Sequence, residues 1–387
     1  RAQFTVNWLL CETADVTEAL KLEMLEHILE GLPGSPLRKA LIESGLGEDM
    51  TGVGLETDLR QMYYSVGLKG LAPADVPAAE MLIHETLAAL VEDGIPAEAV
   101  EAAVNSVEFS LRENNSGRFP RGLSAMIQSL STWLYGGDPL APLAWEAPLA
   151  AIKKQLAEGV PVFENTLRQW FLNNEHRAVV SLLPDTELAA RREARERERL
   201  DGIQAACTPA EREEVVRETA RLREAQGAPD TPEALSTIPG LGLHDLPKTN
   251  PRIPLEAREA GGRPFLLHDI DTCGVVYAGL LLPLHGVPER LVPLVPLLGR
   301  ALTEMGTQRR GFVELGMHIA AKTGGVWGAP LLSTARERQT PVAFLVVGGK
   351  AVADKVDDLF DIFREILLEP SLDQRERFGQ MLLEAKA

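Results

Sequence analysis

The residues best suited to chemistry are few and mostly far apart along the chain. Seven histidines are present: His27, His84, His176, His244, His268, His285 and His318. No two of them stand four positions apart, so no predicted helix places two imidazoles on one face for a metal ion. One short run does group carboxylates with an imidazole, because Glu23, Glu26 and His27 fall on a helix predicted over Thr17–Leu32. This run is the one local cluster of residue types that could ligate a metal ion.

Charge and composition exclude several classes of protein. The net charge is −17, with no basic stripe, which argues against a nucleic-acid partner because phosphate binding needs clustered Lys and Arg. The longest apolar run, Gly274–Leu284, is shorter than the roughly 18 residues of a membrane span, so we expect no membrane partner. Cys11, Cys207 and Cys273 fit no metal-binding spacing and indicate a reducing compartment. We expect a cytoplasmic, bacterial-like location.

The helix that carries Glu23–His27 belongs to an internal repeat with an offset of about 270 residues. Each copy runs in the order strand, two helices, two strands, two helices. The first copy is predicted at Phe4–Cys11, Thr17–Leu32, Leu37–Ser44, Gly52–Thr57, Gln61–Leu68, Pro77–Asp93 and Ala97–Asn114. The second is predicted at Gly274–Leu284, Pro288–Met305, Gly311–Lys322, Val326–Ser333, Pro341–Gly348, Val352–Leu368 and a helix from about Asp373. This order predicts an α+β fold of duplicated layered modules, each a mainly antiparallel sheet with helices on one face.

The first copy continues beyond its paired helices, and the second does not. Further elements are predicted at Phe119–Leu134, Ala147–Glu158 and Ala178–Leu183, whereas the second copy stops at Ala387, within its last helix. The chain also begins at Arg1, next to a strand. We therefore expect an internal part of a longer protein, truncated in its last module.

A highly charged segment, Glu187–Gln226, separates the two copies. It is dense in Arg and Glu, and Thr208-Pro209 at its middle has the pattern of a helix N-cap followed by Pro at the first helical position. We predict a helical hairpin that straps the modules together, followed by an extended Pro- and Gly-rich linker. The expected boundaries are 1–184 for the first module, 185–230 for the hairpin, 231–260 for the linker and 261–387 for the truncated module. Because the hairpin has little apolar surface, we expect the two modules to fold as separate units.

Three local segments resemble the pitrilysin/insulinase-type zinc metallopeptidases, and most closely their presequence-protease branch. Gly34-Ser35-Pro36-Leu37-Arg38-Lys39-Ala40 and the following residues to Gly47 look like a segment of the second module of these enzymes. Leu243-His244-Asp245-Leu246-Pro247 looks like the start of their third module. Gly306-Thr307 and Gly324-Gly325-Val326 are similar to that module's GT…TGG pattern. The resemblance implies a second module, the hairpin and a truncated third module, in that order.

The family's chemistry is zinc-assisted peptide hydrolysis by a helix bearing His-x-x-Glu-His, with a carboxylate from a second helix as third ligand. Glu23-Met24-Leu25-Glu26-His27 occupies the matching helix, but Glu23 replaces the first histidine. Glu23 could ligate zinc in principle, and the third ligand would then come from Glu98, Glu101 or Glu108. We interpret the run as a degenerate copy that binds no metal, so the chain alone is expected to be inactive and to hold no cofactor.

The resemblance leads to one main functional hypothesis and one alternative. In the first, the chain is a non-catalytic part of a zinc endopeptidase that degrades short unfolded peptides, forming the chamber wall and the hinge between halves. Zinc would then belong to the parent protein, and the partners would be peptide substrates together with an N-terminal catalytic module and a C-terminal module. In the alternative, the same modules build a non-enzymatic structural or peptide-binding subunit.

Overall fold

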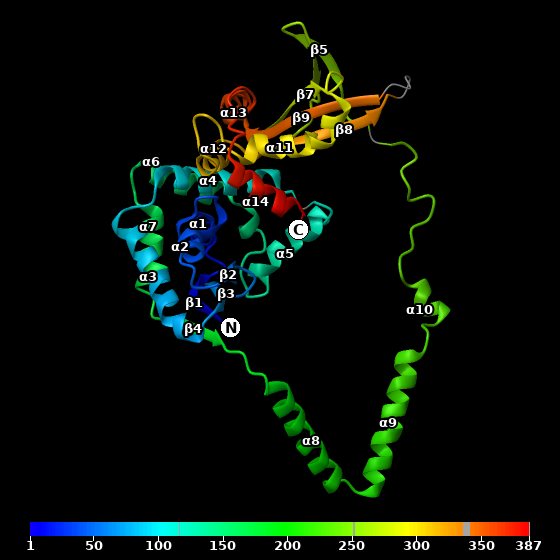
Figure 1. Ribbon diagram of the computed structural model, residues 1–387. Coiled ribbons are helices and arrows are strands. Elements are labelled where there is room, and N and C mark those ends of the chain that lie inside the picture. Colours follow the sequence, from blue (N-terminus) through cyan, green and yellow to red (C-terminus); the bar gives the residue numbers. More distant parts are fainter. Residues whose placement is uncertain (116, 251, 336–340, 387) are drawn as a thin grey trace. The chain divides into compact units, whose positions relative to one another are not determined.

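The N-terminal module, residues 1–183, is organised around an antiparallel sheet (Figure 1). The structure is a computed structural model that describes residues 1–115, 117–250, 252–335 and 341–386. Across these residues the sheet has four strands in the order β2-β3-β1-β4. The strands are β1 Ala2–Glu12, β2 Asp49–Glu56, β3 Gln61–Leu71 and β4 Arg177–Leu182.

Helices cover one face of this sheet. Burial alternates along β1, so that Phe4, Val6 and Trp8 are buried while Gln3 and Thr5 on the other face stay partly exposed. The helices are α1 Val16–Glu26, α2 Pro36–Glu43, α3 Val76–Glu92, α4 Ala97–Glu113, α5 Arg121–Trp133, α6 Glu146–Ala157 and α7 Val162–Leu167. A wider, π-helical turn over His27–Gly31 continues α1. The large apolar side chains between sheet and helices form one continuous core.

The C-terminal module, which begins at Asp271, repeats this arrangement. Its described strands form a sheet in the order β7-β9-β8, which corresponds strand for strand to β1-β3-β2. The elements are β7 Val275–Pro283, α11 Val295–Glu304, α12 Phe312–Lys322, β8 Val326–Thr334, β9 Pro341–Val352, α13 Val356–Leu368 and α14 Arg375–Lys386. The predicted repeat and the α+β class are thus confirmed. The helix expected over Pro288–Met305 is divided, because its first part, Glu289–Leu294, forms a 3₁₀ helix with Pro293 inside it.

The expectation that the two modules fold as separate units is wrong. Residues 1–183 and the chain from Asp271 onward form one compact unit, within which α4 lies against α12 (Figure 1). The expectation rested on the charged hairpin, and no residue of the hairpin helices is buried. The modules are instead coupled by direct contact between helices that are distant in the sequence.

The hairpin and linker form a second unit, Pro184–Ile270. It contains α8 Leu188–Ala206, α9 Pro209–Gly227 and α10 Pro232–Ser236. Thr208 caps α9 as predicted, in a reciprocal arrangement with Glu211. The segment expected to be an extended linker differs at its end, where β5 Glu256–Ala260 pairs with β6 Arg263–Leu267.

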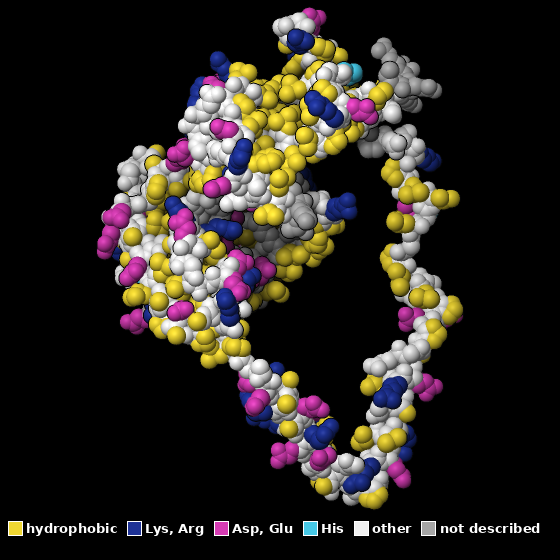
Figure 2. Space-filling model, viewed as in Figure 1, with side chains coloured by type: hydrophobic (Ala, Val, Ile, Leu, Met, Phe, Trp, Pro, Cys, Tyr) yellow, Lys and Arg dark blue, Asp and Glu magenta, His cyan; other side chains and the backbone are white. Residues whose placement is uncertain are grey.

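Apolar side chains gather on the surface of the C-terminal module. Figure 2 shows hydrophobic side chains over the region where Figure 1 places α11 and β8. Leu294, Leu298, Trp327 and Leu332 are among the exposed large residues there. Over the described part of the chain, no helix is both long and apolar enough to cross a bilayer.

Candidate functional site

The cluster Glu23–His27 lies where α1 passes into its π-helical turn. Glu23 is exposed, whereas Glu26 is partly buried and accepts a hydrogen bond from the backbone N–H of Leu55 at 2.8 Å. Burial raises the pKa of Glu26, an effect that the Leu55 hydrogen bond partly offsets. Burial also lowers the pKa of His27, so its ring is neutral at pH 7. Although Glu23 is the most exposed of the three residues, burial raises the pKa of its carboxyl as well, and the nearby charge of Glu26 adds to that shift.

The carboxylates considered as a third metal ligand are placed on α4, and two of them are already paired. Glu98 is exposed. Glu101 accepts from the ammonium of Lys322 at 2.7 Å, and Glu108 is bound by Arg112 and Lys153. Within the described ranges, no group of three or more His, Cys, Asp or Glu side chains is arranged to hold a metal ion. The residues present do not fit a zinc site.

The centre of the contact between the modules is a buried amide on α4. The side chain of Asn105 donates to the backbone carbonyl of Ala320 at 2.8 Å and to that of Thr323 at 2.9 Å. These carbonyls lie at the C-terminal end of α12, where helices leave their last acceptors without partners inside the helix. Asn105 is only 4% exposed, so the α12 end is capped by a residue from the other module. We call the contact of α4 with α12 and with the neighbouring strands β7 and β9 the joint.

Ion pairs flank Asn105 on both sides along α4. Toward the N-terminus, Glu101 pairs with Lys322 and, at 3.5 Å, with Lys355. Partial burial raises the pKa of the Glu101 carboxyl, but the hydrogen bond and charge of Lys322 outweigh it and hold that pKa below its ordinary value. The joint is therefore electrostatically complementary, with carboxylates on the N-terminal module and lysines on the C-terminal one.

The second ion pair is the less exposed of the two. Both oxygens of Glu113 accept from Lys350 at 2.8 Å, and the hydroxyl of Tyr277 donates to the same carboxylate at 2.8 Å. Burial opposes ionisation of Glu113, yet the bonds from Lys350 and Tyr277 keep its pKa below the ordinary value. The pKa of Tyr277 is raised to about 12, chiefly because its hydroxyl is partly buried and further because it donates a hydrogen bond to Glu113.

The Thr323-Gly324-Gly325 segment has a packing role at the joint. A Cβ on Gly324 would lie 2.2 Å from the Phe109 ring, so only glycine permits α4 to approach this closely. Gly324 also donates its N–H to Lys350 O at 2.7 Å. Phe109 packs with Val275 and Val352 of the other module. The TGG pattern thus provides a surface for the neighbouring module.

Sequence reasoning missed Asn105 and Phe109. The available signal was an Asn in the middle of a helix whose neighbours Ala102, Ala103 and Val104 are apolar, since a buried amide needs partners. Its partners are 215 and 218 residues away along the chain, and no local pattern identifies them.

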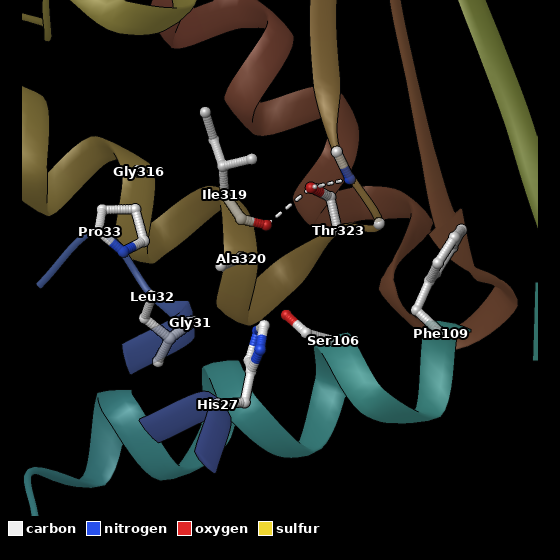
Figure 3. Close-up of a pocket in the computed structure, with 12 residues that line it drawn as sticks. His27, Gly31, Leu32, Pro33, Ser106, Phe109, Gly316, Ile319, Ala320 and Thr323 are labelled. Carbon is white, nitrogen blue, oxygen red and sulfur yellow. Dashed lines mark hydrogen bonds between the residues drawn. The ribbon is translucent and has the colours of Figure 1, made fainter. Parts of the chain in front are cut away.

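A cavity of about 250 Å³ lies beside the joint (Figure 3). The π-helical turn of α1, α4 and the C-terminal half of α12 all contribute to its wall. Figure 3 shows the His27 ring and the Ser106 hydroxyl pointing toward the space below α12. His27, the histidine of the degenerate motif, therefore faces the joint. It does not lie with Glu101 and Glu108, whose carboxylates are paired with cationic side chains.

Comparison with known proteins identifies the class to which this architecture belongs. Residues 182–387 match the family model described as Peptidase M16 (subfamily C) associated, and residues 1–107 match that described as Peptidase M16 inactive domain. The chain belongs to the M16 peptidase family, which is the pitrilysin/insulinase type, and to its presequence-protease branch. It is a non-catalytic part of such a peptidase.

Two relatives in particular support the same assignment by sequence. Presequence protease 1, chloroplastic/mitochondrial, of Arabidopsis thaliana is 41% identical over 99% of this chain. Protein HypA of Clostridium perfringens is 30% identical over 100% of it. The chain spans 36% and 40% of the lengths of these two relatives. A crystal structure of pitrilysin aligns with 100% of this chain and 38% of its own, at 12% identity and a TM-score of 0.43.

Proposed function

We propose that this chain is the wall and hinge region of a zinc metalloendopeptidase that degrades short unfolded peptides. The two modules form adjacent parts of a peptide chamber, and the hairpin unit Pro184–Ile270 is the covalent strap between the halves. When bound, zinc would polarise the carbonyl of the peptide bond to be cleaved and activate a water molecule. In this proposal the zinc ligands belong to a catalytic module outside this sequence. The residues of this chain hold its two modules in a fixed orientation.

The observation that carries this proposal is the joint. An inactive module that only filled space would need no buried amide cap across a module boundary. Asn105, Glu101 and Glu113 each contact the other module through a specific polar partner. Such contacts fix one orientation, which is what a chamber that must bring distant substrate-binding groups together requires.

The test compares this chain with the full-length protein that contains it. The assay is hydrolysis of a quenched fluorogenic peptide of about 20 residues, the unfolded class that a closed chamber accepts. We expect hydrolysis by the full-length protein that a metal chelator stops, and none by the chain alone. Asn105→Leu in the full-length protein should lower the rate while leaving zinc content unchanged, because the proposal assigns the zinc ligands to another module.

Two outcomes would overturn the proposal. Chelator-sensitive hydrolysis by the chain alone, abolished by Glu26→Gln, would show that the degenerate helix is catalytic. A full-length protein that binds the peptide and cleaves none of it would favour the alternative, a non-enzymatic peptide-binding subunit built from the same modules.

A further inference from the structure

The cavity beside the joint has a composition that restricts what it can hold. Its apolar wall includes Leu32, Phe109 and Ile319, and several other positions are glycines that contribute only backbone. None of the residues described around it is Asp, Glu, Lys or Arg. No side chain of this lining carries a charge that could pair with a charged ligand, so a neutral occupant fits the cavity best.

Two polar side chains face this apolar space without partners. Among the described residues, neither the His27 ring nor the Ser106 hydroxyl makes a hydrogen bond, and both are partly exposed. Desolvation keeps His27 neutral, so one ring nitrogen is an acceptor. A Cβ on Gly31 would lie 2.4 Å from His27 Nδ1, which shows that this side of the ring is pressed against the π-helical turn and leaves Nε2 as the freer nitrogen.

We propose that this cavity is a binding site for a small neutral molecule with a one-ring or similarly sized apolar body and a single hydroxyl. The hydroxyl donates to His27 and accepts from Ser106, while the body fills the space against Phe109 and Ile319. The size is consistent with this class, because a cavity of about 150 Å³ already admits benzene. The assignment does not depend on the proposed peptidase role.

Binding at this position would reinforce the joint. His27 and Ser106 belong to the N-terminal module, whereas Ile319 and Gly324 belong to the C-terminal one. A molecule in the cavity contacts both modules at once, so it binds the joined arrangement and not a separated one. It therefore stabilises the joined state by mass action.

The experiment uses the whole chain with two matched probes, 4-methylphenol and toluene, which differ only in the hydroxyl. Binding is followed by calorimetry and by ligand-observed NMR. We expect saturable binding of both, with 4-methylphenol about five-fold tighter, the effect of roughly one net hydrogen bond. Ser106→Ala should reduce that difference, because it removes one of the two partners of the ligand hydroxyl. Ser110→Ala, an exposed serine one turn further along α4 that does not line the cavity, should leave it intact.

A blocking variant locates the site. Ala320→Leu places additional carbons into the cavity from α12 and should abolish binding of both probes, with folding checked by thermal melting. Equal affinity for the two probes, no saturable binding, or full binding by a folded Ala320→Leu protein would each overturn the proposal. If Ala320→Leu does not fold, the Ser106→Ala and Ser110→Ala pair decides the outcome alone.

Discussion

Helix α4 and the hairpin helix α8 use similar residue types and have opposite structural roles. Both carry several glutamates within fewer than 20 residues. Helix α4 buries eight residues, including Asn105, while α8 buries none. On α4 the glutamates at 101 and 113 are met by lysines of the other module, and on α8 Glu196 is met by Arg199 of its own turn. The presence of charged residues therefore does not decide whether a helix couples the two modules. What decides it is how far away in the sequence the charged partner lies and whether the ion pair is buried.

The same contrast distinguishes a covalent connection between the two modules from the packing that holds them together. The hairpin connects the modules covalently without burying any α8 or α9 side chain, and the joint couples them without any covalent link. Exposed ion pairs contribute about 0–1 kcal/mol because water competes and two side chains lose freedom. Buried hydrogen bonds matter more, since a lost partner leaves a desolvated group behind.

The largest expected difference between the two regions is in protease susceptibility. Limited proteolysis should cut first within Pro184–Ile270, because nearly every described residue of that unit is exposed, and should leave the two modules associated. Gel filtration of the nicked protein should show both pieces eluting together. Early cleavage within α4 or α12, or separation of the two pieces after nicking, would contradict a stable joint.

The next largest effect is expected at Asn105. Asn105→Leu leaves the carbonyls of Ala320 and Thr323 without their donor in a buried site, and should cost about 2 kcal/mol of unfolding free energy. The matched control is Gln204→Leu, which replaces an exposed amide on α8. Urea unfolding should show a lower midpoint only for the α4 variant. Equal midpoints for the two variants would mean that Asn105 does not couple the modules.

Much of this architecture is predictable from the sequence, and the joint is not. Apolar periodicity identified the paired helices and the strands of both copies, because each element must bury one face locally. The β5–β6 hairpin also has a local signal in the sequence, Gly261-Gly262, and both glycines adopt a positive φ in the turn between the two short strands. Asn105 and Glu113 have no such signal. Their partners lie more than 200 residues away, and pairing at that distance depends on the completed fold.

Charge removal should give a graded series. Glu113→Gln should cost roughly 1–2 kcal/mol, since its side chain is only 13% exposed and accepts from two donors. Glu101→Gln should cost less, about 0.5 kcal/mol, because that side chain is 42% exposed. Glu196→Gln on α8 should have no measurable effect. Urea midpoints give the order, and a Glu196 effect as large as that of Glu113 would refute the role of burial.

The pH dependence of stability follows from the joint carboxylates. The pKa values of Glu101 and Glu113 are lowered in the folded protein, so their contribution is complete above the unfolded glutamate pKa of about 4.3. It is lost as the pH falls through the folded values. Glu26 and Glu30, whose pKa values are raised by burial, act in the opposite direction. The gap in stability between wild type and Glu113→Gln should therefore begin to narrow as the pH falls below the unfolded glutamate pKa and go on narrowing as it falls through the lowered folded pKa. A constant gap over this fall in pH would contradict an ionised Glu113.

The smallest expected effect is at the degenerate cluster, where metal analysis should find no stoichiometric zinc. Glu23 is exposed, Glu26 already accepts from Leu55, and the α4 carboxylates Glu101 and Glu108 are held by cations. Recruiting either α4 carboxylate to a metal would break an ion pair, and breaking the Glu101 pair would weaken the joint. Dialysis against zinc, followed by elemental analysis of wild type and His27→Ala, should give the same value, well below one zinc per chain. About one zinc per wild-type chain, lost in His27→Ala, would show that Glu replaces His as a ligand in this helix and that the cluster is a working metal site.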